Sequence, residues 1–517
     1  MSTPRRPWPR STGAPMISML RFRALMEPER VALTARLGHT ARVRVSLSVI
    51  VLVAIGLLLM PSRPSARLAP EPGVKASAGS RGGVAREAVL EIVNQGAVRL
   101  EGHYARPGDV MRFESKRRFL ADGKGALRLE WTTWAEGDSE RIPETILLAR
   151  GRVYDQEHPG GPWDELTGSA AERARLQVLS GFPTVIAESG ARLGIQVQRA
   201  KNGRVMAGRW RHAHPRLGDV VDSVAYRYGE TAAPVGTVLR IHERDQAWTL
   251  EELRLSSRET TLSDSLFLPP REVTRASVDP DSLSGEAVIG SALAPGVWPV
   301  DMADVDSRSL VVEFSDYLAV IEAAVSSANG ERLVDAVKKR WPSKPIRYAL
   351  VSHHHPHYVG GLRALMAEGA TVVTTPGNAA LVHQIAAYSF RLRPDRLARS
   401  PRALSVRTFD QRFELSDATN RLVAVNIGER SQHTAEFAVF WLPQARLLFE
   451  TELGWVTVNG TLRATRRAAK LLATLDEEHL DVDRLVQSWP MRGNRAEMSR
   501  AELTAMVAAQ AQAQAGK

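Results

Sequence analysis

The sequence predicts an α+β or α/β protein in which a mostly antiparallel β domain precedes a layered α/β domain. Within residues 86–280, runs such as "VMRFESKRRFL" and "ALRLEWTTWA" alternate apolar and polar residues between glycine-rich turns, as half-buried strands do. Beyond residue 285, apolar runs such as "IRYALVS" alternate with helical patterns such as "GERLVDAVKKRWP", which is typical of α/β layers. An uncharged run of 15 residues near the N-terminus comes before both parts.

The composition of the 517-residue chain fits a globular protein, because 44% of the residues are hydrophobic and 24% are charged. There is no cysteine, so a metal would have to be held by histidine, carboxylate or tyrosine. The formal net charge is +11, but residues 1–45 hold nine arginines against two glutamates and carry most of this excess. No basic patch with interleaved aromatic residues follows in the sequence. We therefore expect no nucleic-acid partner.

The N-terminal residues form three segments of different composition. Residues 1–45 are a basic leader, residues 46–60 ("SLSVIVLVAIGLLLM") are an apolar core, and residues 61–85 are a flexible linker rich in proline, glycine and serine. The apolar core is shorter than the roughly 17–25 residues of a full membrane span. We predict an uncleaved signal anchor, with a cleaved signal peptide as the alternative. The protein would then be anchored in the inner membrane with its bulk in the periplasm, or be periplasmic if the signal is cleaved.

The β domain (residues 86–280) also holds one segment with helical spacing, "SAAERARLQVLSGFPTVIAES", from residue 169 to residue 189. Its strand pattern faintly resembles that of periplasmic lipoprotein carriers. The resemblance implies a curved sheet that cups an apolar ligand. A small-molecule or lipid-derived substrate is the expected partner, because it suits exposure to the periplasm.

Four histidines gather within five positions of "YALVSHHHPHYVGG", directly after an apolar strand. His353 and His355 are two residues apart, so their imidazoles can point the same way. A third imidazole could come from His433 in "SQHTAEFAVFWLP". Three neutral imidazoles with an open fourth position make a catalytic zinc site. We predict a single zinc ion held by His353, His355 and His433.

The segments "VSHHHPHYVGG", "SQHTAEFAVFWLP" and "LLFETEL" together resemble the metallo-β-lactamase-fold hydrolases. The resemblance places a domain of that fold in residues 285–517. It implies a four-layer αββα architecture and a zinc-dependent hydrolysis of an ester, thioester, lactone or lactam.

Four positions depart from the motif of that family, which reads His-x-His-x-Asp-His. His357 replaces the aspartate and Tyr358 replaces the following histidine, while Glu452 and Arg492 fall where a bridging aspartate and a last histidine are expected. The resemblance therefore implies that the second metal site is lost, since arginine cannot ligate and its charge repels a cation. In the remaining site, His357 or Glu452 would handle the proton, and Tyr358 or Arg492 would steady an oxyanion or bind an anionic group.

Two functions stay open at the level of the sequence. The first is a mononuclear zinc hydrolase. The second is a catalytically inert, membrane-anchored binding or envelope scaffold protein that keeps the fold without the chemistry, because fold alone does not imply function.

Overall fold

The computed structural model describes residues 86–515, except for 92–95, 99–105, 107–110, 136–143, 157, 231–233, 244–246, 260–261, 274, 279–284 and 463–464. The predicted leader, apolar core and linker, residues 1–85, lie outside the described residues. Among the residues described, no helix is both long and apolar enough to cross a membrane.

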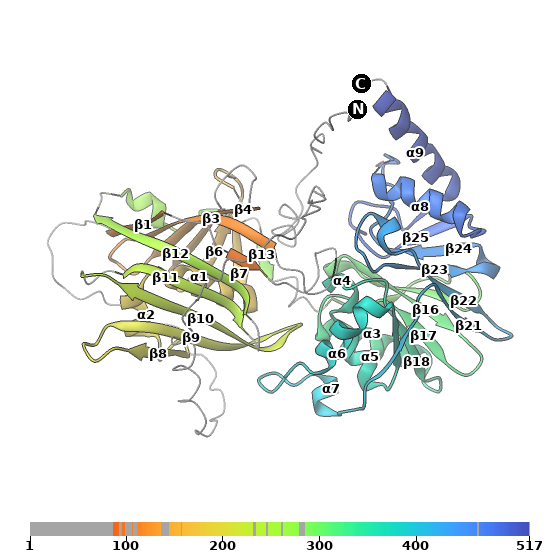
Figure 1. Ribbon diagram of the computed structural model, residues 1–517, viewed down its shortest axis with the longest axis horizontal. Helices are drawn as coiled ribbons and strands as arrows, with labels where there is room; N and C mark the ends of the chain where they lie inside the picture. Colours follow the sequence, from red (N-terminus) through yellow and green to blue (C-terminus); the bar gives the residue numbers. More distant parts are fainter. Residues whose placement is uncertain are drawn as a thin grey trace, which may run out of the picture.

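The first part of the chain forms one large sheet of 13 strands, as the alternating pattern predicts (Figure 1). Its neighbouring strands pair antiparallel, except that β13 and β7 run parallel. The strands are β1 (Arg86–Glu91), β2 (Gly96–Val98), β3 (Met111–Ala121), β4 (Leu127–Ala135), β5 (Glu144–Ala149), β6 (Arg152–Gln156), β7 (Asp164–Thr167), β8 (Ile195–Arg199), β9 (Val205–His214), β10 (Gly218–Tyr228), β11 (Pro234–Glu243), β12 (Ala247–Glu259) and β13 (Arg275–Val278).

The segment with helical spacing forms two helices, α1 (Gly168–Leu179) and α2 (Pro183–Ser189). Leu176 of α1 and Ile186 of α2 share one buried hydrophobic cluster with Phe119 and Leu129 of the sheet. Gly181 between the helices lies so close to Phe119 that an added Cβ would meet the ring at 2.3 Å. The helices therefore pack tightly on the apolar face of the sheet and cover part of it with the chain's own side chains.

The second part of the chain contains two further sheets. The first runs β14 (Val288–Ile289), β15 (Val297–Met302), β16 (Ser307–Glu313), β17 (Leu318–Ile321), β18 (Ile346–Leu350), β19 (Thr371–Thr374) and β20 (Ser405–Thr408). The second runs β21 (Arg412–Ser416), β22 (Arg421–Asn426), β23 (Ala438–Leu442), β24 (Leu447–Glu450), β25 (Arg484–Gln487) and β26 (Glu497–Ser499).

Side chains that alternate along the strands bind these two sheets to each other and to helices outside them. Leu310 and Val312 of β16 pack against Phe440 of β23 between the sheets, whereas Val311 points to the opposite face. That outer face is covered by α3 (Ser327–Arg340), α5 (Leu362–Ala367) and α6 (Ala379–Ala386). Val439 points outward from the second sheet, under α8 (Arg466–Glu477) and α9 (Arg500–Ala515). The result is the predicted αββα arrangement of four layers.

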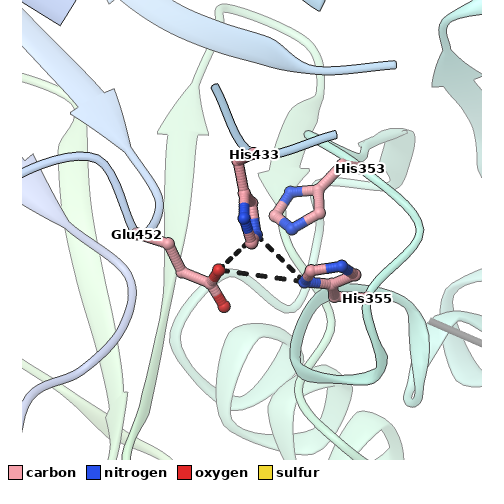
Figure 2. A group of neighbouring side chains, drawn as sticks. All are labelled: His353, His355, His433 and Glu452. Carbon is pink, nitrogen blue, oxygen red and sulfur yellow. Dashed lines mark hydrogen bonds and ion pairs between the residues drawn. The ribbon is translucent and has the colours of Figure 1, made fainter. Parts of the chain in front are cut away.

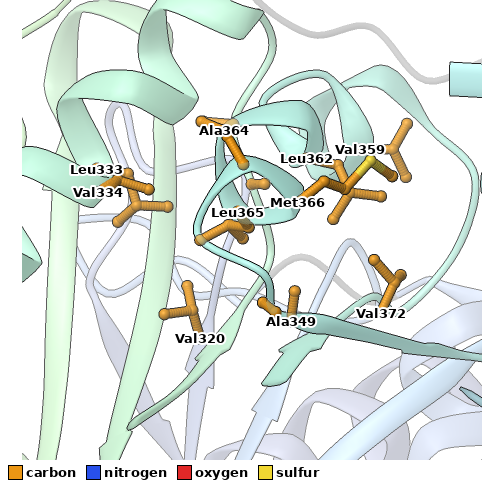
Figure 3. Packing of buried hydrophobic residues seen from close by; sticks show 14 of the residues in the cluster. Val320, Leu333, Val334, Ala349, Val359, Leu362, Ala364, Leu365, Met366 and Val372 are labelled. Atoms are coloured by element: carbon orange, nitrogen blue, oxygen red, sulfur yellow. The ribbon is translucent and has the colours of Figure 1, made fainter. Parts of the chain in front are cut away.

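The first helical layer explains the glycine pair in "HYVGGLRAL". Leu333 and Val334 of α3 and Leu365 of α5 lie over Val320 and Ala349 of the sheet (Figure 3). The backbones also meet, because a Cβ on Gly330 of α3 would sit 2.1 Å from the carbonyl oxygen of Gly361. The glycines therefore let α3 and the start of α5 touch, which fixes the loop that carries the histidines.

One hairpin of the large sheet is bonded to the second part of the chain. The carboxylate of Asp219, in β10, accepts hydrogen bonds from the Ser389 hydroxyl at 2.7 Å and from the backbone N–H groups of Arg391 and Leu392 at 3.0 and 2.9 Å. Leu217 and Val220 beside it belong to the same buried cluster as α3 and α5. The two parts are thus joined by apolar packing as well as by hydrogen bonds.

Candidate metal centre

The histidine loop, residues 351–355, begins where β18 ends, at the carboxyl ends of the parallel strands β17 to β20. The backbone N–H of Ser352 donates to Glu322 Oε1 at 3.1 Å, and the carbonyl of Ser352 accepts from the N–H of Ala438 at 2.9 Å. These two bonds tie the loop to both sheets. Pro356 then opens the short helix α4 (Pro356–Val359), as its fixed φ favours at a first helical position.

Three imidazoles from two loops converge there (Figure 2). His355 Nδ1 lies 3.1 Å from Nε2 of His433, which stands in the loop before β23. His353 Nδ1 is 2.9 Å from the hydroxyl of Ser352, and this bond orients its ring. The other ring nitrogen of His353, Nε2, is buried and has no hydrogen-bond partner.

The carboxylate of Glu452 joins the three imidazoles. Its Oε2 is paired with His433 Nε2 and lies 3.8 Å from His355 Nδ1. One ligand atom from each of His353, His355, His433 and Glu452 lies within 4.8 Å of the others. Glu452 has a φ of +59°, a left-handed conformation that is uncommon for a residue with a side chain. The Glu452 carboxylate thus lies beside the histidines themselves.

The donor set fits a zinc ion. Burial lowers the pKa of His355 to about 4 and that of His353 well below its usual value, which keeps both rings neutral with lone pairs to donate. Burial alone would raise the pKa of Glu452, but His433 and His355 outweigh it and hold that pKa well below its usual range. The buried Nε2 of His353, which otherwise bonds to nothing, is the observation that a metal explains best.

Two further side chains meet Glu452. The hydroxyl of Tyr358, a fully buried residue, donates to Glu452 Oε1 at 3.2 Å. Arg467 Nη1, in the first turn of α8, lies 3.7 Å from Glu452 Oε2 and donates to the Glu452 carbonyl at 3.4 Å. Burial raises the pKa of Tyr358 well above its usual value, so the phenol stays a proton donor.

The other predicted site residues lie elsewhere. His357 is buried against Trp489, with ring centroids 4.9 Å apart, and is not among the four grouped ligands. Arg492 is exposed, and its backbone N–H donates to Asp306. Among the described residues no ion pair joins Arg492 to Glu452, and the cation beside that carboxylate is Arg467. His354 is buried with its ring nearly perpendicular to those of His353 and His355.

Sequence reasoning missed Arg467 and two buried acids, Glu322 and Glu450. Burial raises the pKa of Glu322 well above its usual value and that of Glu450 to about 8, so Glu450 is mostly neutral near pH 7. Glu322 follows the apolar run in "LAVIEAA", and Glu450 ends the apolar run in "LLFETEL". An acid placed directly after such a run could have indicated a buried carboxyl. Arg467 had none, because a basic residue at the start of a helix usually lies in solvent.

A scan against protein-family models finds no match, and a search of curated proteins finds none either. Among solved structures, a metallo-β-lactamase from Pontibacter korlensis is 17% identical, over 43% of this chain and 98% of its own, with a TM-score of 0.33. A metallo-β-lactamase from Pseudomonas aeruginosa in its mono-zinc form is 17% identical, over 45% of this chain and 98% of its own, also with a TM-score of 0.33.

A sec-alkylsulfatase from a Pseudomonas species is 14% identical over 44% of this chain, with a TM-score of 0.31. This chain spans 42% of the length of that alkylsulfatase. TM-scores this low add no weight to the architecture. The two sheets and their flanking helices form four αββα layers, and the histidine group lies at the sheet edge.

Proposed function

We propose that the protein is a metal-dependent hydrolase that holds one zinc ion at His353, His355 and His433. The observation that carries the proposal is the buried Nε2 of His353, which faces the other ligand atoms and has no partner. The substrate would be an ester, thioester, lactone or lactam, from a small molecule or a lipid-derived compound.

The chain's own residues would divide the work around the ion. When bound, zinc supplies a Lewis acid that polarises a carbonyl and makes water acidic enough to react near neutral pH. Ser352 fixes the ring of His353, so that Nε2 faces the group. Glu452, ionised and within reach of the histidines, can accept the proton of the attacking water, and Tyr358 holds its second oxygen in place.

A second candidate, an inert binding or envelope scaffold protein, is favoured by one specific observation. A carboxylate oxygen of Glu452 lies within 4.8 Å of a ring nitrogen of each of the three histidines, so the protein alone can supply four ligands. Four protein ligands are typical of structural zinc sites, whereas catalytic sites keep one position for water. In that case the metal would stabilise the fold, and the large sheet would do the binding.

The location of the protein belongs to the same proposal. An N-terminal anchor in the inner membrane, with residues beyond about 61 in the periplasm, is supported by the arginine-flanked apolar run at residues 46–60. A periplasmic protein with a cleaved signal is the alternative. A lipid-derived ligand for the large sheet is supported by its strand pattern alone.

Hydrolysis assays separate the two candidates. The full chain, loaded with zinc, would be tested on a panel of esters, thioesters, lactones and lactams, before and after chelation. His353→Ala should abolish the activity, whereas His383→Ala, at an exposed position of α6, should leave it unchanged. Activity that survives both chelation and His353→Ala would rule out the proposed centre. Bound zinc without hydrolysis of any substrate would favour the scaffold.

A further inference from the structure

The loop that leads from α6 to α7 (Arg396–Arg399) presents an apolar side chain between two basic ones. Arg391, Leu392 and Arg393 are consecutive in this loop, and all three are exposed. Leu392 is 50% exposed, although most large apolar residues of the described chain are buried. A leucine flanked by two arginines therefore faces solvent.

The two arginines carry charge that the neighbouring acids do not balance. Asp395, which follows the loop, is buried and accepts hydrogen bonds from Nε and Nη2 of Arg363 at 2.6 and 3.1 Å. Within the described part of the chain, no carboxylate forms an ion pair with Arg391 or Arg393. The loop thus presents two positive charges to whatever lies in front of it.

The backbone of the loop is held by the large sheet. The Asp219 carboxylate accepts from the Ser389 hydroxyl at 2.7 Å and from the N–H groups of Arg391 and Leu392 at 3.0 and 2.9 Å. The charge of this carboxylate is balanced by these donors and by Arg211, whose Nη2 lies 3.9 Å away. Because the loop is already ordered, little conformational entropy would be lost when a partner binds to it.

A hollow of about 470 Å³ lies beside the two arginines. Ser389, Phe390, Arg391 and Pro394 contribute to its lining. A guanidinium and a hydroxyl are thus combined there with an aromatic ring and a proline ring. Such a lining suits a phosphate group that is joined to an apolar body better than it suits a free inorganic ion.

We propose that this loop binds the surface of a bilayer that contains anionic phospholipids, with Arg391 and Arg393 at the phosphates and Leu392 in the interface. An anionic membrane surface attracts arginines close to it, and an apolar side chain beside them can enter the boundary between headgroups and acyl chains. The proposed anchor at residues 46–60 is followed by a linker, residues 61–85, that spans at most about 90 Å. A membrane would therefore lie within reach. The inference goes beyond the proposed function and does not depend on the metal centre.

A fluorescent label at position 392 tests this inference in the full chain. The protein has no cysteine, so Leu392→Cys provides a single attachment site for a nitrobenzoxadiazole label, which takes the place of the leucine side chain. The labelled chain would be reconstituted into vesicles of phosphatidylcholine, with or without phosphatidylglycerol, that contain a doxyl-labelled lipid as quencher. We expect quenching at least about threefold stronger with phosphatidylglycerol, because two arginines then bind an anionic surface.

The matched control places the same label at Val288→Cys. Val288 is 52% exposed and lies in β14, at the opposite edge of its sheet from β20, the strand that follows the loop and α7. Its quenching should not differ between the two kinds of vesicle. A difference at position 288 as large as that at position 392 would overturn the inference, since the whole protein would then approach anionic vesicles without a specific contact.

The charge of the loop is tested in two independent ways. Arg391→Gln combined with Arg393→Gln, in the Leu392→Cys chain, should remove at least about half of the additional quenching. About 1 M sodium chloride should do the same with both arginines in place, because it shortens the Debye length to about 3 Å, so this measurement decides even if the substituted chain folds poorly. Quenching at position 392 that is equal in both kinds of vesicle, or that salt leaves unchanged, would contradict the proposed contact.

Discussion

Replacing Tyr358 with phenylalanine isolates one hydrogen bond at the centre of the site. The hydroxyl donates to Glu452 Oε1 at 3.2 Å, and both residues are buried. Glu452 is ionised, so the lost bond is one to a charged group, and such bonds contribute about 1.5–3 kcal/mol. The ring itself stays and keeps its packing against His353, 4.6 Å away between centroids. We therefore expect Tyr358→Phe to lower the free energy of unfolding of the metal-free protein by about 1.5–3 kcal/mol.

Urea unfolding of the metal-free chain, followed by circular dichroism, measures this loss. The matched control is Tyr348→Phe, which removes a hydroxyl from a partly buried tyrosine that packs on Tyr317 and Phe413 in the same sheet region. That change should alter the free energy of unfolding by less than about 0.5 kcal/mol. If Tyr358→Phe also lowers the free energy of unfolding by less than about 0.5 kcal/mol, the claim that the phenol holds the Glu452 carboxylate is refuted.

Three further predictions concern the rest of the molecule. Asp219→Ala removes the acceptor of three hydrogen bonds from residues 389–392, so limited proteolysis should cut that loop faster, and an unchanged cutting rate would show that the hairpin does not hold it. Phe440→Ala empties a buried position between the two sheets and should cost about 3–5 kcal/mol in urea unfolding, whereas a cost under about 1 kcal/mol would mean that the sheets pack differently. Burial alone would raise the pKa of Asp395, but hydrogen bonds from Arg363 and Ser327 hold this pKa below its usual value. The ionised Asp395 therefore contributes its full stabilisation above about pH 4, and this stabilisation is lost as the pH falls through the lowered pKa. Unfolding curves of Asp395→Asn should therefore lose this acid-dependent step, and an unaltered step would assign it to other carboxyls.

The layers of the second part and its three histidines could be predicted because their signals are local. Strand period, helix period and the spacing of His353 and His355 all lie within short stretches of sequence. The later position of His433, just before an apolar strand, then makes it the predicted third ligand. The structure brings these three residues together.

The surroundings of Glu452 could not be predicted in the same way, because they depend on contacts between distant segments. Tyr358 reaches Glu452 across 94 residues of sequence, and Glu322 bonds to a loop 30 residues away. Arg492 falls where the family motif has its last histidine, yet it lies at the surface. The cation beside Glu452 is instead Arg467, in the first turn of α8. The Glu452 carboxylate also lies beside His433 and His355, and this contact between separate loops could not be seen in the sequence.

The metal content of the purified chain tests the central claim most directly. Elemental mass spectrometry, after zinc loading and removal of loosely bound ions, should find about one zinc per chain in the wild type and none in His433→Ala. His383→Ala, at an exposed position, should keep the wild-type content. A wild-type protein that binds no zinc, or that binds two ions per chain, would contradict a single centre at His353, His355 and His433.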